Sequence, residues 1–403
     1  MKNITLSNKT DTLIKVILFL ISPFVSFLYS LRNIKSKSSY IVFFLFCVFF
    51  GMALTIPENY SGDASVYQKR FEYITNYDNT KFLSMLQNYS EFDDGEKDIY
   101  FKTTAFIVSR ISGNYHTLFC VFAAIFAFFM LKSLRFLTRE QEFDNSFIPF
   151  LLVTIFILSN FIFNINGVRF WTASWIGIYS VFQIFINNNK KYFLLACVTP
   201  LVHVSFFAFV IILIVGYFTK QYEKFWIFML FISFILSNIM VNLVSSFGDY
   251  LPSFMSNTVS IYTDVDYVKQ REEDLVLYAR IFSFLRQLMI NIVVLLFIRN
   301  RKTISSPTTK NLYFFLIIFT TFVNFVMPIP SFGGRFLALS LPLIAYIWVI
   351  AFKNTMQYRP ILYLFIVAFS YHFFLQIRGF FKLTEIDFYI FNPFYIINKY
   401  LLI

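Results

Sequence analysis

The sequence predicts an all-α fold, a polytopic bundle of transmembrane helices. Hydrophobic residues make up 58% of the 403 residues and charged residues 14%, against about 25% charged residues in soluble proteins. Apolar runs long enough to cross a bilayer, about 17–25 residues each, recur along the chain. Basic and acidic residues gather in different connections between these runs. This composition excludes a disordered chain, a disulfide scaffold and almost any soluble enzyme.

About ten apolar runs predict full spans. They lie near 13–31, 40–56, 115–131, 146–164, 169–186, 225–247, 275–298, 311–328, 336–352 and 360–377. The first run is similar to a signal peptide, but Lys15 interrupts its start and no small-residue cleavage site follows, so we interpret it as a helix. Because no internal repeat is evident, we expect residues 1–403 to form a single membrane domain.

The distribution of charge predicts the orientation. Short loops carry 16 of the 34 basic residues and only four acids: 32–38, 132–145, 187–191, 218–224, 299–310 and 353–359. Basic short loops are typical of the cytoplasmic side. The two long segments 57–114 and 248–274 hold 15 of the 22 acidic residues. We therefore expect these two segments to face outward and the basic loops to face inward.

The stretch 192–217 predicts a re-entrant hairpin. Basic residues flank it on both sides, at Lys190 and Lys191 and at Lys220 and Lys224, so both of its ends are expected inside. Its 26 residues are too few to cross twice at about 20 residues per crossing. We expect two half-helices that turn near Pro200 and border a cavity, because re-entrant backbone is tolerated only where protein or water covers it. The alternative is one long tilted helix.

His203 lies just past this predicted turn. A histidine near the middle of the membrane is a candidate proton acceptor or ligand-binding group in a cavity. The alternative is a buried histidine bonded to a neighbouring carbonyl. For His372, inside the last span, and His116, at the start of another, we favour a structural role.

Four arginines lie outside the basic loops, at or near the outer side of the membrane: Arg169, Arg280, Arg286 and Arg335. The positive-inside rule disfavours arginine there, and burial of its charge in lipid is expensive. Arginine forks bind phosphate bidentately, so a shared anionic ligand would explain the set. The alternative is that each snorkels to the headgroups or pairs with an acid such as Glu272, Glu273 or Asp274.

Other polar groups give weaker signals. Asp63 begins the first outer segment, where it is a candidate proton acceptor, with Tyr67 one turn on as a platform for a sugar ring. The alternative is a helix-capping aspartate before an interfacial helix. Asp264 and Asp266 form a D-x-D pair without supporting ligands, and we expect no metal and no cofactor. The three cysteines lie in apolar runs, and no nucleotide-binding motif is present.

In these residues the chain resembles the bacterial O-antigen and capsule polysaccharide polymerases of the Wzy type, in particular their EpsG-like branch. The resemblance covers roughly residues 40–350. It rests on an ordered set of short patterns: Gly62-Asp63 with Tyr67, Gly167-Val168-Arg169, His203-Val204-Ser205 and Phe332-Gly333-Gly334-Arg335-Phe336. One departure matters: neither Arg169 nor Arg280 has a glycine eleven residues on, so roles assigned through an R-x(10)-G pattern do not carry over.

The resemblance implies a reaction and its partners. Such enzymes join oligosaccharide repeat units carried on undecaprenyl diphosphate at the outer face of the bacterial inner membrane. Their helical framework is similar to that of lipid-dependent C-type glycosyltransferases, and they use no nucleotide sugar and no metal. A chain-length regulator and a flippase of the same pathway are expected partners, and nucleic acid is not.

The candidate residues suit that chemistry. The four arginines would stabilise the leaving diphosphate, and His203 or Asp63 would take the proton of the acceptor hydroxyl. Two alternatives stay open. A ligase that transfers finished O-antigen would need the same diphosphate chemistry. A flippase or small-anion transporter would also place arginines against an anionic group, although such proteins usually have two similar halves.

Overall fold

The computed structural model describes residues 8–57, 62–90, 99–144, 146–236, 246, 276–329 and 331–402. Within those ranges the regular secondary structure is helical, apart from one antiparallel bridge between Leu54 and Thr384. Six helical stretches there are long and apolar enough to cross a membrane: Tyr115–Thr138, Phe147–Phe185, Leu277–Arg299, Pro307–Val326, Gly333–Ala351 and Met356–Lys382. The predicted polytopic helical membrane bundle is confirmed.

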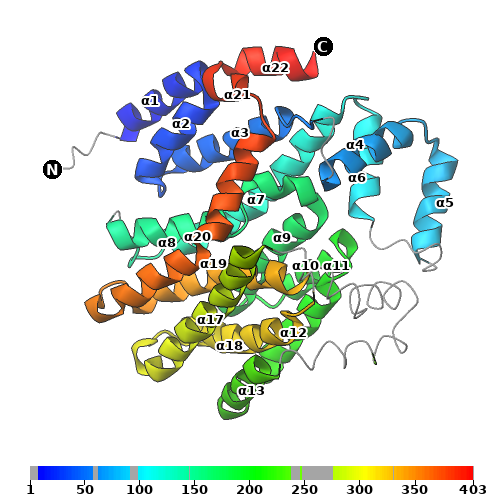
Figure 1. Ribbon diagram of the computed structural model, residues 1–403. Coiled ribbons are helices and arrows are strands. Elements are labelled where there is room, and N and C mark those ends of the chain that lie inside the picture. Colours follow the sequence, from blue (N-terminus) through cyan, green and yellow to red (C-terminus); the bar gives the residue numbers. More distant parts are fainter. Residues whose placement is uncertain are drawn as a thin grey trace.

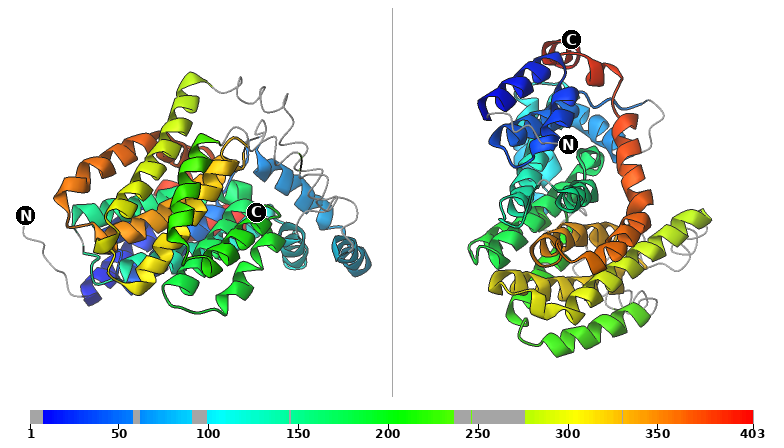
Figure 2. Two further views of the ribbon diagram at one scale, coloured as in Figure 1. Left: turned by 90° about the horizontal axis from the view of Figure 1, so that it is seen from below. Right: turned by 90° about the vertical axis from the view of Figure 1, so that its left-hand side faces the viewer.

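The helices pack side by side in one series (Figure 1). Next to one another along it lie α3 (Lys37–Met52), α7 (Tyr115–Thr138), α8 (Phe147–Ser159), α19 (Gly333–Ala351), α18 (Pro307–Val326) and α13 (Glu223–Ile235). α9 (Val168–Phe185) packs against α7 and α18. Two further helices, α17 (Leu277–Arg299) and α20 (Arg359–Lys382), pack against each other. Figure 2 shows α20 along one flank of the bundle, from the neighbourhood of α17 to the end where α1–α3 lie.

The predicted basic loops share one face of the bundle, which we call the basic-loop face. Arg139 donates to Asn187 at 2.8 Å, and Arg301 pairs with Glu223 at 3.0 Å. Lys35 donates to the carbonyl of Phe143, and Lys353 lies 3.3 Å from Asp144. Tyr358 also donates to Asn300 Oδ1 at 2.7 Å. Together these contacts join all six loops, so the part of the topology that puts them on one side is confirmed.

The opposite face carries the ends of α3, α7 and α20. Thr55 donates to the carbonyl of Leu383, and His116 contacts that of Met52 at 2.8 Å. Part of the long segment 57–114 is described on this face as α4 (Asp63–Ile74), α5 (Asn79–Ser90) and α6 (Tyr100–Ser109). The other acidic segment, 248–274, and with it Asp264 and Asp266, lies outside the described residues.

The predicted single span over 13–31 is wrong, because the chain folds back in the middle of it. α1 (Asn8–Ile21) and α2 (Pro23–Ser30) form a hairpin in which Ser26 Oγ donates to the carbonyl of Lys15 at 2.8 Å. Proline favours extended backbone in the residue before it, and Ser22 has φ −157° and ψ 124°. Lys15 Nζ also donates to Ser36 at 2.9 Å, so the start of α1 lies near the basic-loop face.

The re-entrant hairpin over 192–217 is confirmed. It comprises α10 (Tyr192–Ala196), α11 (Thr199–Val202) and α12 (Phe206–Phe218). The rings of Phe193 and Tyr217 lie 5.2 Å apart, so the segment ends beside its start. The expected turn at Pro200 is wrong by three residues. Pro200 occupies the first turn of α11, where proline is tolerated, and the chain turns at His203, which has φ −155° and ψ 123°.

Candidate functional site

Arg169 and Tyr67 join α9 to α4 on the face opposite the basic loops. Arg169 Nε donates to Tyr67 Oη at 3.0 Å, and its guanidinium carbon lies 5.6 Å from the centre of the tyrosine ring. Tyr67 is only 2% exposed and stacks on Phe101 with 4.8 Å between ring centres. The ring is therefore unavailable as a platform for a sugar, contrary to the expectation for Tyr67. In this structure Tyr67 positions Arg169 instead.

Asp63 sits at the first turn of α4, close to the same end of α9. Gly62, not Asp63, is the N-cap residue, and Asn166 Oδ1 accepts from the amide of Ala64 at 3.1 Å. A Cβ atom added to Gly167 would lie 3.5 Å from Asp63 Oδ2. The alternative role of Asp63 as a helix cap is therefore wrong, because Asn166 fills that role. The carboxylate of Asp63 is exposed beside Gly167.

Phe170 connects this pair to two more of the predicted residues. The ring of His203 meets Phe170 edge-on with 5.3 Å between centres. The guanidinium carbon of Arg335 lies 5.4 Å from the centre of the Phe170 ring. Because Phe170 follows Arg169 in the chain, α4, the first turn of α9, the turn of the hairpin and the start of α19 meet here. Of the predicted residues, His203 and Arg335 contact Phe170 directly. Asp63, Tyr67 and Arg169 gather at the same end of α9, beside Gly167 and at the residue before Phe170.

Close packing of glycine sets the position of Arg335. Gly333 begins α19, and a Cβ atom there would come within 2.3 Å of Met327 Cα at the end of α18. Under 3.0 Å such a contact forces the backbone to move. Only glycine therefore allows α18 and α19 to join this tightly, and Arg335 follows within the first turn of α19.

His203 is oriented by its own hairpin. The amide of Ser205 donates to His203 Nδ1 at 3.3 Å, and the hydroxyl of Ser205 lies 2.7 Å from the same nitrogen. Since Nδ1 accepts a hydrogen bond, a neutral ring carries its proton on Nε2. The proton-accepting nitrogen thus faces the Ser205 hydroxyl. Ser205 belongs to the His203-Val204-Ser205 pattern, but no feature of the sequence predicts a role for it.

The other two predicted arginines lie on α17. Arg286 Nε donates to the carbonyl of Phe282 at 3.3 Å, and its charge is within electrostatic reach of Tyr371 and His372 on α20. Among the described residues, no carboxylate lies within salt-bridge distance of Arg286 or Arg335. The expected partners of Arg280 and Arg286, Glu272, Glu273 and Asp274, lie outside the described residues. Arg280 and Arg286 thus lie on α17, whereas Arg169 and Arg335 lie in the first turns of α9 and α19.

The α-helix is interrupted between α8 and α9, and side chains of α9 and α20 hold the backbone of this connection. The connection runs through Asn160 and η2 (Ile162–Gly167). Trp175 Nε1 donates to the carbonyl of Asn160 at 3.1 Å, and Gln376 Oε1 accepts from the amide of Phe161 at 3.3 Å. His372 Nε2 contacts the carbonyl of Ser159 at 3.2 Å, in line with the structural role that we favoured for it.

Lys102 on α6 is a further polar group that the sequence did not single out. It follows Phe101, which stacks on Tyr67. Burial lowers the pKa of Lys102, and the charge of Arg70 lowers it further. No short pattern marks Lys102 or Asn166 in the sequence, because their importance comes from contacts between distant segments.

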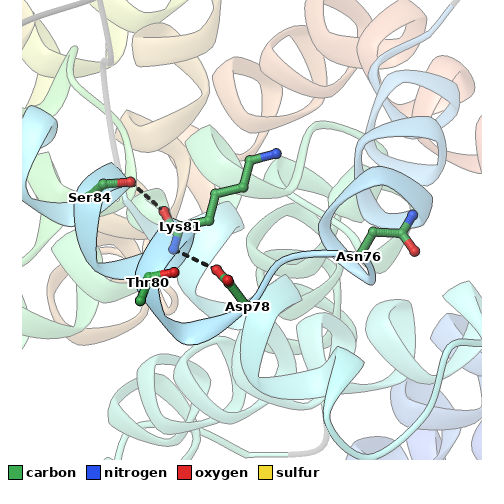
Figure 3. Close-up of a pocket in the computed structure, with 5 residues that line it drawn as sticks. All are labelled: Asn76, Asp78, Thr80, Lys81 and Ser84. Carbon is green, nitrogen blue, oxygen red and sulfur yellow. Dashed lines mark hydrogen bonds between the residues drawn. The ribbon is translucent and has the colours of Figure 1, made fainter.

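A surface pocket of about 470 Å³ lies elsewhere, at the start of α5 (Figure 3). Its side chains serve the helix: the amide of Lys81 donates to Asp78 at 2.8 Å, and Ser84 donates to the carbonyl of Lys81 at 2.9 Å. None of the predicted site residues lines it. Over the described ranges, no group of three or more His, Cys, Asp or Glu residues is arranged to hold a metal ion.

Comparison with known proteins gives one match. A family model described as the EpsG family matches residues 40–392. This range contains every residue that meets around Phe170, together with the hairpin and both arginines of α17. No curated protein and no solved structure matches the chain.

Proposed function

Because the chain belongs to the EpsG family, we propose that it polymerises oligosaccharide repeat units carried on undecaprenyl diphosphate, for O-antigen or capsule polysaccharide. It is a multi-pass membrane protein. In this proposal the protein lies in the bacterial inner membrane with the basic-loop face in the cytoplasm. The residues around Phe170 then face outward. On that side a flippase would deliver the lipid-linked units, and a chain-length regulator would act together with the protein.

The reaction transfers the growing chain to the incoming unit. The bond between the anomeric carbon of the donor and its diphosphate oxygen breaks, and the lipid diphosphate leaves with the electron pair. The same carbon forms a bond to a hydroxyl oxygen of the acceptor sugar, and the hydroxyl proton passes to a base. The protein must therefore stabilise charge on a diphosphate and accept one proton.

The observation that carries the proposal is that His203 and Arg335 both contact Phe170, which follows Arg169 at the start of α9, where Asp63 lies beside Gly167. Two fixed guanidinium groups supply the charge that a leaving diphosphate needs without a metal. We assign Arg169 and Arg335 to the diphosphate and give Tyr67 the task of positioning Arg169. Arg280 and Arg286 are proposed as further contacts of a lipid diphosphate along α17.

His203 and Ser205 offer a route for the proton. The Ser205 hydroxyl, 2.7 Å from Nδ1, would give its proton to the imidazole as it takes the proton of the acceptor hydroxyl. Asp63 is the alternative base, because its carboxylate is exposed beside Gly167. If His203 is the base, substitution of His203 removes activity. If Asp63 is the base, substitution of Asp63 removes it.

A gel of surface glycan from a strain that lacks the protein tests the function. A polymerase predicts that the ladder disappears while a single repeat unit stays attached to the lipid core, and that the full chain restores the ladder. Loss of all attached glycan would instead indicate a ligase or a flippase. An unchanged ladder would refute any role in this pathway.

A further inference from the structure

An apolar groove runs between α2, α8 and α20. It has a volume of about 220 Å³, and its walls include Leu28 of α2, Phe150 and Leu158 of α8, and Ile377 and Phe381 of α20. Among the described residues that line it, Thr154 alone has a polar side chain, and its hydroxyl donates to the carbonyl of Phe150 at 3.0 Å. The groove therefore offers no hydrogen-bonding group to a ligand and suits a hydrocarbon.

The size of the groove favours a segment of chain rather than a headgroup. A volume of 220 Å³ corresponds to about seven groups the size of a water molecule, at about 30 Å³ each. Along α8 the lining runs from Phe150 to Leu158, about 12 Å at 1.5 Å per residue, and Phe161 follows beyond the end of that helix. The groove thus extends along α8 from the side of the basic-loop face, at Ile34 and Phe150, toward η2.

The end of the groove at Phe161 lies next to the connection between α8 and the candidate site. Phe161 lines the groove and comes directly before η2, and η2 ends at Gly167 beside Asp63. The 6 residues of η2 span about 12 Å at 2.0 Å per residue. Phe163 and Asn166 within η2 are only half-buried. The groove therefore ends beside η2, whose other end lies at Gly167 and Asp63.

We propose that this groove holds the polyprenyl chain of the lipid-linked substrate whose diphosphate binds at Arg169 and Arg335. This inference rests on the proposed function. Phenyl rings form much of the wall, from Phe24, Phe27, Phe150, Phe161, Phe380 and Phe381, and their flat faces suit a chain with methyl branches and double bonds. The two arginines select a diphosphate at the head of that chain, which a phospholipid lacks.

Substitutions that fill the groove test the proposal. The purified full-length protein in phosphatidylglycerol nanodiscs is incubated with a photoreactive polyprenyl diphosphate, and labelled peptides are identified. We expect labels on α2, α8 and α20, with competition by unlabelled polyprenyl diphosphate and none by a fatty acyl chain. Thr154→Trp and Ile377→Trp, from different helices, should each lower labelling at least tenfold.

Leu364→Trp is the matched control, because Leu364 is on α20, 59% exposed, and outside the groove. This variant should be labelled as strongly as the native protein. Elution of each variant as a single species in size-exclusion chromatography establishes that it is folded. Full labelling of both groove variants, labels on other helices, or equal competition by an acyl chain would overturn the proposal. A native glycan ladder in the deletion strain would instead overturn the proposed function, independently of where the probe binds.

Discussion

Two breaks interrupt the helices that surround the candidate site, and they are held in different ways. The α8–α9 break (Asn160–Gly167) is bonded by Trp175 of α9 and Gln376 of α20, and Asn160, Ile162, Asn164 and Ile165 are buried. The α11–α12 break (His203–Ser205) is half-buried throughout, with Ser205 bonded to the ring of His203.

The difference indicates different tasks. In a membrane, a backbone group without a hydrogen bond costs several kcal/mol. The α8–α9 break is therefore stable only with the hydrogen bonds from Trp175 and Gln376. These partners fix the start of α9 and thereby Arg169. The α11–α12 break leaves His203 and Ser205 half-buried, and our proposal places the proton acceptor there. We infer that the first break is structural and the second is chemical.

The largest effect is expected at the α11–α12 break. His203→Ala removes the proposed proton acceptor, and general base catalysis contributes about 10²–10⁴-fold. We expect a loss of that size in polymer formed per folded protein, measured with lipid-linked repeat units in nanodiscs. His116→Gln, which changes a histidine bound to the carbonyl of Met52, should stay within about twofold. Native activity of His203→Ala would transfer the role to Asp63.

Arginine substitutions test whether guanidinium groups stabilise the leaving diphosphate. Arg335→Ala should lower polymer formation by about 10²–10³-fold, the usual effect of removing one preorganised donor at a developing anion. Arg286→Ala should also abolish long glycan chains while the protein stays in the membrane. The matched control is Arg139→Ala, because Arg139 also lies over a phenyl ring, Phe136 at 4.2 Å, but at the basic-loop face. Native chain-length distributions in both Arg286→Ala and Arg335→Ala would refute the diphosphate assignment.

The α8–α9 break should respond in stability rather than chemistry. Gln376→Leu leaves the buried amide of Phe161 without its acceptor, which costs about 1–3 kcal/mol. We expect a lower Tm and less folded protein, with nearly native activity in the fraction that folds. Gln357→Leu changes an exposed glutamine of the basic-loop face and should leave Tm unchanged. A large loss of activity at native Tm would show that the α8–α9 break takes part in the chemistry.

The features that could be predicted from the sequence are those that hydrophobicity and charge determine. The membrane bundle, the shared face of the basic loops and the hairpin over 192–217 follow from run length and charge, which act locally or along one face. The sequence also selected Arg169, His203 and Arg335, because polar residues stand out in apolar runs. The hairpin at Ser22 was missed, because Ser22-Pro23 lies inside an otherwise continuous apolar run. Asn166 and Gln376 were missed because their bonds reach residues 102 and 215 positions away.

The smallest effect is expected at Asn166, which joins the α8–α9 break to α4. Asn166→Ala removes the acceptor for the amide of Ala64 and should cost about 1 kcal/mol, as loss of a helix cap does. Asn392→Ala is the matched control, because Asn392 Oδ1 caps α22 (Pro393–Leu401) by accepting from Tyr395 at 2.9 Å. Both variants should lower Tm by a similar small amount. Only Asn166→Ala should also lower polymer formation, by a few-fold, because Asp63 and Tyr67 shift with the start of α4. Equal activity in the two variants would show that the position of α4 does not matter to the site.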